Sequence, residues 1–293
     1  MTPFSIVLVL ISALIHSSWN FFTKRGNWPL EFFFWVFLGG TLLFLPFFFA
    51  LSDFPALLFQ APSRFWYLSM LSGFIQTIYF ICLIEAYRVG DLSIVYPVSR
   101  SAPLFTLIWA VLFIGEILSV TGTIGIGLVL VGIFVVSLRD FHLGSIIQSS
   151  KHFTSRAYLL AFISAITGSI YSVIDKVGVQ VIHPAIYTWL IDLWMCIYIG
   201  VYLLFQKGGS FRNVWQESKK EILTIVILQN VAYLLALMAL QMSKVSYVVA
   251  FRQVSVLFAA GMGIIFLKES QWKNRITGAL ILTLGLVLIG LAK

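Results

Sequence analysis

The chain has 293 residues, of which 60% are hydrophobic and only 10% are charged, and its mean hydropathy is +0.99. This composition excludes a water-soluble globular domain, which would need far more polar surface. The net charge of +8 does not indicate nucleic-acid binding, because most of the basic residues lie in short breaks between apolar runs, where they anchor a protein at anionic lipid headgroups.

Ten apolar runs follow one another, each close to the ~20 residues that a helix needs to cross a bilayer. Uninterrupted runs of this length lack the alternating pattern of barrel strands. We therefore predict an all-α integral membrane protein, and we expect the first run to remain as a helix because it has no basic leader and no small-residue cleavage site. The predicted transmembrane helices cover residues 3–22, 30–51, 65–86, 92–114, 118–138, 157–176, 184–205, 221–242, 246–267 and 275–292.

The two halves of the sequence match each other at an offset of 152 or 153 residues. The tripeptide Ile-Ser-Ala at residues 11–13 recurs at 163–165, and Gln76 matches Gln229. Each half holds five predicted helices, and this odd number forces the second copy to start on the opposite side of the membrane. Inverted repeats are typical of alternating-access carriers, which bind substrate near the bilayer midplane.

We therefore predict two inverted five-helix repeats, at residues 1–140 and 157–293, joined by a loop at 141–156. Within the fifth helix of each repeat, two glycines lie seven residues apart and so share a helical face. Small residues allow helices to approach closely, and we expect helices 5 and 10 to pack through Gly125, Gly132, Gly278 and Gly285.

Helix 1 ends in the segment His16-Ser17-Ser18-Trp19-Asn20, with Lys24 shortly after, and Glu116 and Glu269 each follow the fourth helix of a repeat. Together with the five-plus-five plan over essentially the whole chain, these residues resemble the EamA-domain branch of the drug/metabolite transporter superfamily. The resemblance implies a ten-helix transporter of a small metabolite, without implying which metabolite.

The second half departs from the first at the end of its first helix. Asn20 is replaced by Ser172 and His16 by Gly168. A pocket formed between the repeats is therefore predicted to be asymmetric.

Two arginines lie in the middle of predicted membrane helices, Arg100 in helix 4 and Arg252 in helix 9. A charge at this depth costs about 2.5–3.5 kcal/mol on insertion scales, so such residues are candidates for function. One interpretation is capture of a carboxylate or phosphorus-containing anion, which a guanidinium binds through two parallel hydrogen bonds. The other is structural pairing with Asp192 in helix 7 or Glu85 in helix 3, which are also candidate coupling groups.

Further polar and aromatic residues mark the helix faces that would surround a central cavity formed by helices 1, 3, 4, 6, 8 and 9. Interhelical hydrogen bonding and packing are the alternative for these side chains, and for the histidine both proton coupling and a core hydrogen bond are open. Two prolines, Pro97 and Pro103, are expected to loosen helix 4 beside the cavity. The candidates are His16, Trp19, Asn20, Gln76, Tyr79, Tyr96, Ser99, Tyr171, Gln229, Asn230, Tyr233 and Gln253.

The predicted function is secondary transport of a small anionic or zwitterionic metabolite, amino-acid-like, carboxylate or phosphorus-containing, by alternating access. The alternatives are an intramembrane enzyme acting on a lipid, or a channel or receptor; the chain lacks the Asp-rich and Gly-x-Ser-x-Gly motifs of such enzymes. No metal-ligand spacing or cofactor motif is present, and Cys82 and Cys196 are expected to be buried thiols. We expect a multi-pass protein of the plasma membrane, as in a bacterial inner membrane, as a monomer or homodimer.

The basic residues also predict an orientation. Loops that follow odd-numbered helices hold 13 Lys and Arg, and the other loops with the C-terminus hold 4. Basic loops favour the cytoplasm, so the count predicts both termini outside it, whereas the family resemblance implies both inside. Alkaline phosphatase fused after Lys293 is expected to be active, and a C-terminal fusion active only in the cytoplasm would contradict the count.

Overall fold

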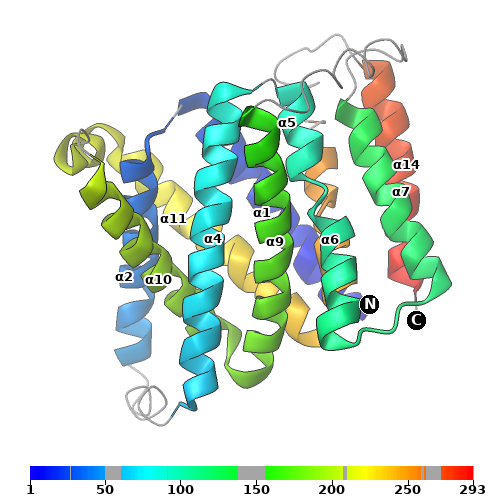
Figure 1. Ribbon diagram of the computed structural model, residues 1–293, viewed down its shortest axis with the longest axis horizontal. Coiled ribbons are helices and arrows are strands. Elements are labelled where there is room, and N and C mark those ends of the chain that lie inside the picture. The colour runs from blue at the N-terminus through cyan, green and yellow to red at the C-terminus, as the bar shows by residue number, and fades with distance from the viewer. Residues whose placement is uncertain are drawn as a thin grey trace.

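The computed structural model describes residues 1–26, 28–49, 61–90, 92–137, 156–206, 210–258, 261 and 272–292, without the side chains of 19–26, 47, 49, 92–94 and 272–273. These ranges form helices and contain no strand (Figure 1). Seven helices are long and apolar enough to cross a membrane, and three shorter apolar helices complete the ten predicted crossings. The chain is an all-α integral membrane protein, as predicted.

Among the described residues, the first repeat forms six α-helices and one π-helix, and its fourth crossing is divided. They are α1 (Pro3–Gly26), α2 (Leu30–Phe49), α4 (Ser63–Val89), α5 (Leu92–Ser99), α6 (Ala102–Trp109), η1 (Ala110–Ile114) and α7 (Val120–Ser137). The second repeat contains α9 (Arg156–Val181), α10 (Pro184–Phe205), α11 (Phe211–Met242), α12 (Val245–Phe251) and α14 (Trp272–Leu291).

The helix contacts follow a two-fold pattern between the repeats. The first helix of each repeat packs against the third helix of the other, so that α1 contacts α11 and α9 contacts α4. Likewise α2 contacts α11 while α10 contacts α4, and equivalent helices pair as α2 with α10 and α7 with α14. Such reciprocal contacts are those of two repeats related by a pseudo-two-fold axis in the membrane plane.

The direction of the chain shows that the second repeat is inverted. The amino group of Met1 donates a hydrogen bond to the carbonyl oxygen of Ala292 at 3.3 Å, so both ends of the chain lie on one side, here called the terminal side. Helix α1 runs away from the terminal side and α9 runs toward it (Figure 1). Two inverted sets of five crossings therefore form the bundle, as the odd helix number predicted.

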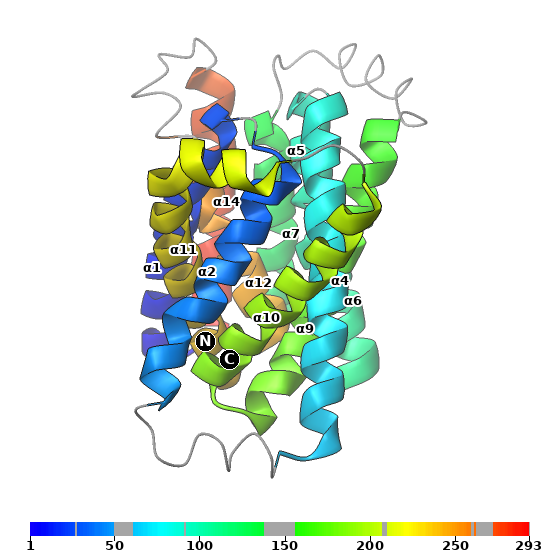
Figure 2. The ribbon, with the colours of Figure 1, turned by 90° about the vertical axis from the view of Figure 1, so that its left-hand side faces the viewer.

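The eighth helix begins earlier than predicted. The sequence placed its start at residue 221, but helix begins at Phe211 and bends at Ser218, where φ is −125° and ψ is 21°. The first turns lie across the bundle end opposite the termini (Figure 2). Trp35 of α2 donates a hydrogen bond to the Phe211 carbonyl at 2.9 Å and its ring lies 4.9 Å from that of Trp215. This short amphipathic segment is held against α2 by aromatic packing, which hydropathy alone does not detect.

Glu116 links the two repeats at the terminal side. Gly115 adopts a left-handed conformation with φ of 70°, which ends η1 and turns the chain. The carboxylate of Glu116 then accepts hydrogen bonds from the backbone N–H of Val245 at 2.6 Å and from the Ser246 hydroxyl at 2.6 Å. An acidic group at a helix N-terminus is stabilised by the unpaired N–H groups and the helix dipole. The glutamate that marks the family resemblance thus caps α12 of the other repeat; Glu269 lies outside the described residues.

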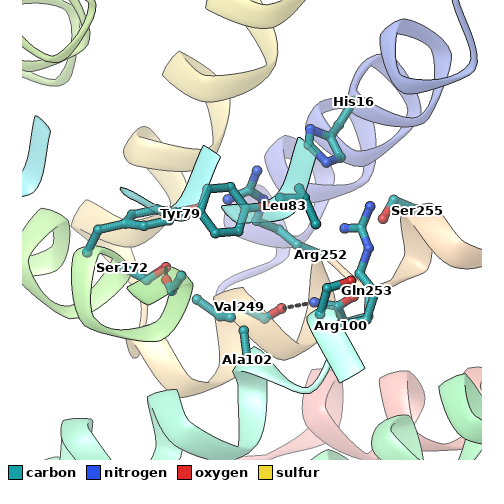
Figure 3. Close-up of a pocket in the computed structure, with 13 residues that line it drawn as sticks. His16, Tyr79, Leu83, Arg100, Ala102, Ser172, Val249, Arg252, Gln253 and Ser255 are labelled. Carbon is teal, nitrogen blue, oxygen red and sulfur yellow. Dashed lines mark hydrogen bonds between the residues drawn. The ribbon is translucent and has the colours of Figure 1, made fainter. Parts of the chain in front are cut away.

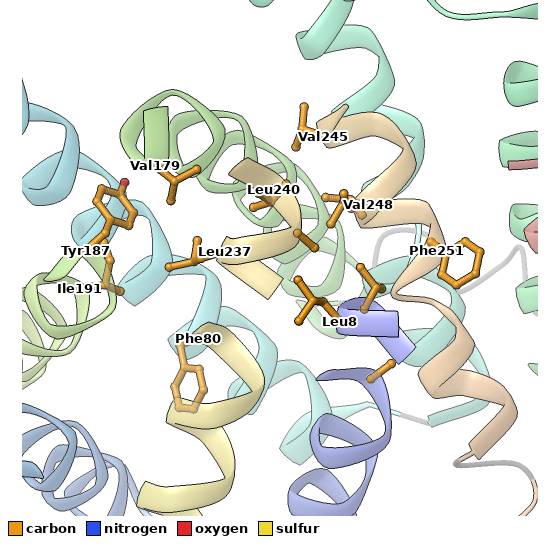
Figure 4. Close-up of a cluster of buried hydrophobic side chains, with 14 of the residues drawn as sticks. Leu8, Phe80, Val179, Tyr187, Ile191, Leu237, Leu240, Val245, Val248 and Phe251 are labelled. Carbon is orange, nitrogen blue, oxygen red and sulfur yellow. The ribbon is translucent and has the colours of Figure 1, made fainter. Parts of the chain in front are cut away.

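A buried apolar cluster packs the two repeats against each other (Figure 4). It combines residues of both repeats, among them Leu8, Phe80, Val179, Tyr187, Ile191, Leu237, Leu240, Val245, Val248 and Phe251. Because α12 starts at the terminal side and α9 ends there, Val245 and Val179 lie on that side of the bundle. The cluster therefore includes apolar residues that pack between the repeats on the terminal side.

Helices α7 and α14 pack through the glycines that the sequence predicted. A Cβ atom built on Gly132 would lie 2.6 Å from the backbone nitrogen of Leu282, and one on Gly125 would lie 2.8 Å from the carbonyl oxygen of Gly285. These neighbours are backbone atoms, which cannot rotate away. By contrast, a Cβ on Gly127 of the same helix would meet nothing within 4 Å.

We predict that Gly132→Ala destabilises the protein by about 1–3 kcal/mol through overpacking and lowers its thermal unfolding temperature in detergent. Gly127→Ala is the matched control, and it is expected to leave this temperature unchanged or slightly higher because alanine favours a helix. Equal unfolding temperatures for the two variants would show that α7 and α14 are not in close contact.

Candidate functional site

A polar cavity lies between the two repeats at the level of the divided helices (Figure 3). Its free volume is about 60 Å³, which corresponds to roughly four water molecules. Helices α1, α4, α5, α6, α9 and α12 and the residues at two helix breaks contribute to it. The lining residues are His16, Tyr79, Leu83, Ser99, Arg100, Ala102, Gly168, Tyr171, Ser172, Val249, Arg252, Gln253 and Ser255.

The first break separates α5 from α6 and carries Arg100. Ser101 has φ of −77° and ψ of 0°, and its N–H bonds the Val98 carbonyl at 3.1 Å, a tight three-residue turn in place of an α-helical one. Pro103 has no N–H to donate, so the α-helical ladder cannot continue through this point. The prolines were predicted to loosen helix 4; in the structure the helix is interrupted between α5 and α6.

The second break, after α12, carries Arg252 without any proline. The N–H of Gln253 bonds the Ala250 carbonyl at 3.1 Å, and that of Ser255 bonds the Arg252 carbonyl at 3.1 Å, again in three-residue turns. Helix resumes at residues 254–258. Both arginines therefore occupy equivalent breaks in equivalent helices, and irregular backbone of this kind is tolerated in a membrane only where it is buried in protein or lines a cavity.

The cavity lining follows the repeat. At the breaks, Ser99, Arg100 and Ala102 line it in the first repeat, and the residues 153 positions later, Arg252, Gln253 and Ser255, line it in the second. His16 of α1 and its equivalent Gly168 of α9 are both among the lining residues. The cavity therefore lies between equivalent parts of the two repeats, and its asymmetry arises from substitutions between equivalent positions.

The charges of the cavity are positive. Neither Arg100 nor Arg252 forms an ion pair with an acidic side chain of the described residues, whose one salt bridge joins Arg88 to Glu85 at 2.8 Å. The Arg100 guanidinium instead lies over the ring of Tyr96, 5.3 Å from its centroid. No Asp or Glu is among the lining residues.

Aromatic and amide groups complete the lining. Tyr79 and Tyr171 meet edge to face with ring centroids 5.4 Å apart. The side-chain amide of Gln253 donates to the Val249 carbonyl at 3.4 Å (Figure 3), while its oxygen is buried without a partner. The described residues contain no group of three or more His, Cys, Asp and Glu side chains that would hold a metal ion.

The other predicted site residues whose side chains are described do not line the cavity. Tyr96 lies beneath the Arg100 guanidinium and is not a lining residue. The side chains of Trp19 and Asn20 lie outside the described residues. Glu85 pairs with Arg88, three residues later on α4, so the expected pairing with the central arginines is wrong for Glu85.

Asp192 is also remote from the arginines. Its side chain is 2% exposed and lies with Asn230 beside Gly40 of α2, where one oxygen of each side chain has no hydrogen-bond partner. The expected pairing of Asp192 with an arginine is therefore wrong. Gln229 also has a buried, unpartnered side-chain oxygen away from the cavity lining.

The sequence analysis missed a buried acid one turn beyond the cavity. Asp175 of α9, which is 1% exposed, accepts hydrogen bonds from Ser72 at 2.5 Å, Tyr187 at 3.1 Å and Tyr233 at 2.6 Å. The Gln76 amide donates to Tyr233 at 2.8 Å and to Ser72 at 3.1 Å. Two predicted cavity residues, Gln76 and Tyr233, therefore belong to this network instead of the cavity lining.

Six further lining residues were also absent from the predicted site: Leu83, Ala102, Gly168, Ser172, Val249 and Ser255. Gly168 and Ser172 are the repeat equivalents of the predicted residues His16 and Asn20. Requiring each predicted lining residue to have its repeat equivalent in the lining would have found these two.

Comparison with known proteins agrees with this architecture. A sequence model of the EamA-like transporter family matches the chain twice, over residues 3–138 and 155–291. The chain belongs to the EamA-like transporter family. This EamA-like protein is thus a multi-pass membrane transporter of the drug/metabolite kind, and the members of its family are transporters and not enzymes.

Solved structures support the fold. The EamA-like chain is similar to a protein of known crystal structure with a TM-score of 0.75 and 13% sequence identity, over 99% of this chain and 98% of that one. At this identity the likeness concerns the fold alone. No curated protein matches the sequence.

We predict that the cavity of this EamA-like transporter admits water. In a variant without Cys82 and Cys196, Ala102→Cys is expected to react with a small anionic thiol reagent, because Ala102 lines the cavity. Ala110→Cys, in the same crossing, is the control and is expected to stay unlabelled because Ala110 is 0% exposed. Mass spectrometry of the intact protein measures both, and an unlabelled Ala102→Cys would indicate a dry cavity.

Proposed function

We propose that this protein is a secondary transporter of a small anionic or zwitterionic metabolite, which binds in the cavity between the repeats. The observation that carries the proposal is the presence of two arginines, Arg100 and Arg252, in a central cavity whose lining holds no acid. A charge within a membrane protein that has no counter-charge is costly. A bound anion supplies the missing partner.

The chemistry of the lining defines the substrate class. A guanidinium matches the two oxygens of a carboxylate or phosphate. The hydroxyls of Ser99 and Ser172 donate to the Tyr96 and Gly168 carbonyls at 3.0 and 2.8 Å, so their oxygens can still accept a hydrogen bond from an ammonium group. The ring of Tyr79 or Tyr171 offers a face to the ammonium group of a zwitterion. A purely cationic substrate is disfavoured because it would face two arginines.

Alternating access is supported by the arrangement of the barrier. Apolar residues such as Val179 and Val245 pack between the repeats on the terminal side, and the inverted repeat supplies equivalent helices for a barrier on the other side. A volume of about 60 Å³ is small for an amino acid or dicarboxylate, so a wider state is needed to admit it. Rocking of one repeat against the other around the helix breaks would provide that state.

The proposal also includes the membrane in which the protein lies and its oligomeric state. The basic residues in the loops suit an anionic lipid surface, as in the plasma membrane or a bacterial inner membrane. The site lies between the repeats of one chain, so a monomer contains a complete site, and a homodimer would add no lining residue.

We predict that Arg100→Ala lowers substrate uptake at least about tenfold, because a hydrogen bond to a charged group contributes about 1.5–3 kcal/mol and every 1.4 kcal/mol is about tenfold in affinity. A thermal-shift screen of carboxylates, amino acids and phosphorus-containing anions selects the substrate, and uptake into liposomes measures the effect. Arg100→Lys keeps the charge and loses the fork geometry, so its uptake is expected to lie between that of the wild type and that of Arg100→Ala.

Arg88→Ala is the matched control, since Arg88 is an exposed arginine of the same repeat outside the cavity, and its uptake is expected to equal that of the wild type. If Arg100→Ala takes up substrate as fast as the wild type, the proposal that Arg100 binds an anion is wrong. Uptake that rises linearly with concentration and shows no counterflow would instead identify a channel.

A further inference from the structure

Asp175 is a buried acid that the proposed anion site does not use. It lies on α9, one helical turn toward the terminal side from Tyr171 and Ser172, which line the cavity. Three hydroxyl groups donate to its carboxylate, at 2.5, 2.6 and 3.1 Å. A carboxylate so deep in a membrane protein is costly unless it has a role or a full set of donors.

The three donors come from three different helices and from both repeats. Ser72 belongs to α4 of the first repeat, whereas Tyr187 and Tyr233 belong to α10 and α11 of the second. Gln76 of α4 adds a second connection, because its amide donates to Tyr233 at 2.8 Å. The Asp175 network therefore fastens the first repeat to the second on the terminal side of the cavity.

The ionisable groups around Asp175 leave it without a direct cationic partner. Tyr187 and Tyr233 face it from α10 and α11, Tyr171 lies one turn away on its own helix, and α4 contributes only the neutral Ser72 and Gln76. Arg252, after α12, acts on it at longer range, and the described side chains of α5 and α6 bring no charge to it.

Lys176, the next residue along α9, does not pair with Asp175. Its ammonium group donates to the carbonyl oxygens of Leu240 and Ser243 at 2.7 and 2.9 Å. The hydroxyl donors therefore provide the direct stabilisation of the Asp175 carboxylate, and they favour the ionised form because hydrogen bonds to a charged acceptor are about twice as strong as neutral ones.

We propose that Asp175 is a proton-binding site that couples proton movement to opening of the terminal side. A proton that binds one carboxylate oxygen converts it from an acceptor to a donor and makes the remaining bonds neutral. The hydroxyl hydrogens stay on Ser72, Tyr187 and Tyr233, so only one proton is taken up. The weakened network then lets α4 separate from α10 and α11, and the proton leaves when the network forms again. The coupling half of this proposal depends on the proposed carrier function.

Infrared difference spectroscopy of the purified protein in liposomes tests proton binding without any substrate. On acidification the wild type is expected to gain the carbonyl bands of protonated carboxylic acids, to which the exposed Asp and Glu also contribute. The wild-type spectrum minus that of Asp175→Asn should isolate one band from Asp175, and Asp175→Glu should show this band at a shifted frequency. Asp192→Asn, which removes a second deeply buried acid of the described residues, is the matched control and should retain the Asp175 band. Identical acid-induced bands in the wild type and Asp175→Asn overturn the proposal.

Transport measurements test the coupling, with radiolabelled L-glutamate, succinate and inorganic phosphate as probes. For a probe that the wild type accumulates along a pH gradient, Asp175→Asn is expected to lose this accumulation at least about tenfold while keeping counterflow exchange. Asparagine retains most of the hydrogen bonds, so a purely structural role of Asp175 predicts that both accumulation and counterflow exchange survive in Asp175→Asn. Accumulation of the probe by Asp175→Asn along a pH gradient would therefore overturn the coupling. If the wild type transports no probe of this class, the anion-carrier function fails, and the infrared result still decides whether Asp175 binds a proton.

Discussion

A polypeptide inside a bilayer has no water to satisfy its backbone, so a helix can be interrupted only where protein or a hydrated cavity replaces the lost partners. The organisation of this transporter depends on that constraint. Its two divided crossings both have their breaks at the centre of the bundle, and each break carries an arginine. The break turns the arginine and the residues around it toward the pseudo-two-fold axis, while the flanking helical segments keep their apolar sides toward lipid and neighbouring helices.

The inverted repeat fixes where a site can be, and substitutions between equivalent positions decide what the site can bind. A symmetric pair of repeats would present two identical half-sites. Here the repeat equivalent of His16 is Gly168, and the repeat equivalent of Arg100 is Gln253 at the offset of the fourth helices. One half therefore contributes a bulky ring where the other contributes space. An asymmetric substrate, with its charge at one end, fits such a lining better than a symmetric one.

Most of the architecture was predictable from the sequence, because it depends on patterns that extend over many residues. Hydropathy located the ten crossings, the repeat offset gave their inversion, and the cost of intramembrane charge singled out Arg100 and Arg252. The missed features depend on a single boundary or turn. Asp175 was overlooked because the sixth helix was predicted to end at residue 176, which would have put the acid at the membrane surface; the helix continues to Val181 and carries Asp175 inside. The break at Arg252 contains no proline, so nothing in the sequence indicated it.

The contact between Met1 and Ala292 has a consequence for how such a molecule can be assembled. The two ends of the chain adjoin each other at the terminal side, so a short peptide would close the polypeptide into a ring without disturbing a helix. In such a ring neither repeat comes first, and every contact between α1 and α11 or between α9 and α4 is available in either gene order. The order of the two repeats along the chain therefore does not decide which helices can meet, although it does decide on which side of the membrane the chain starts.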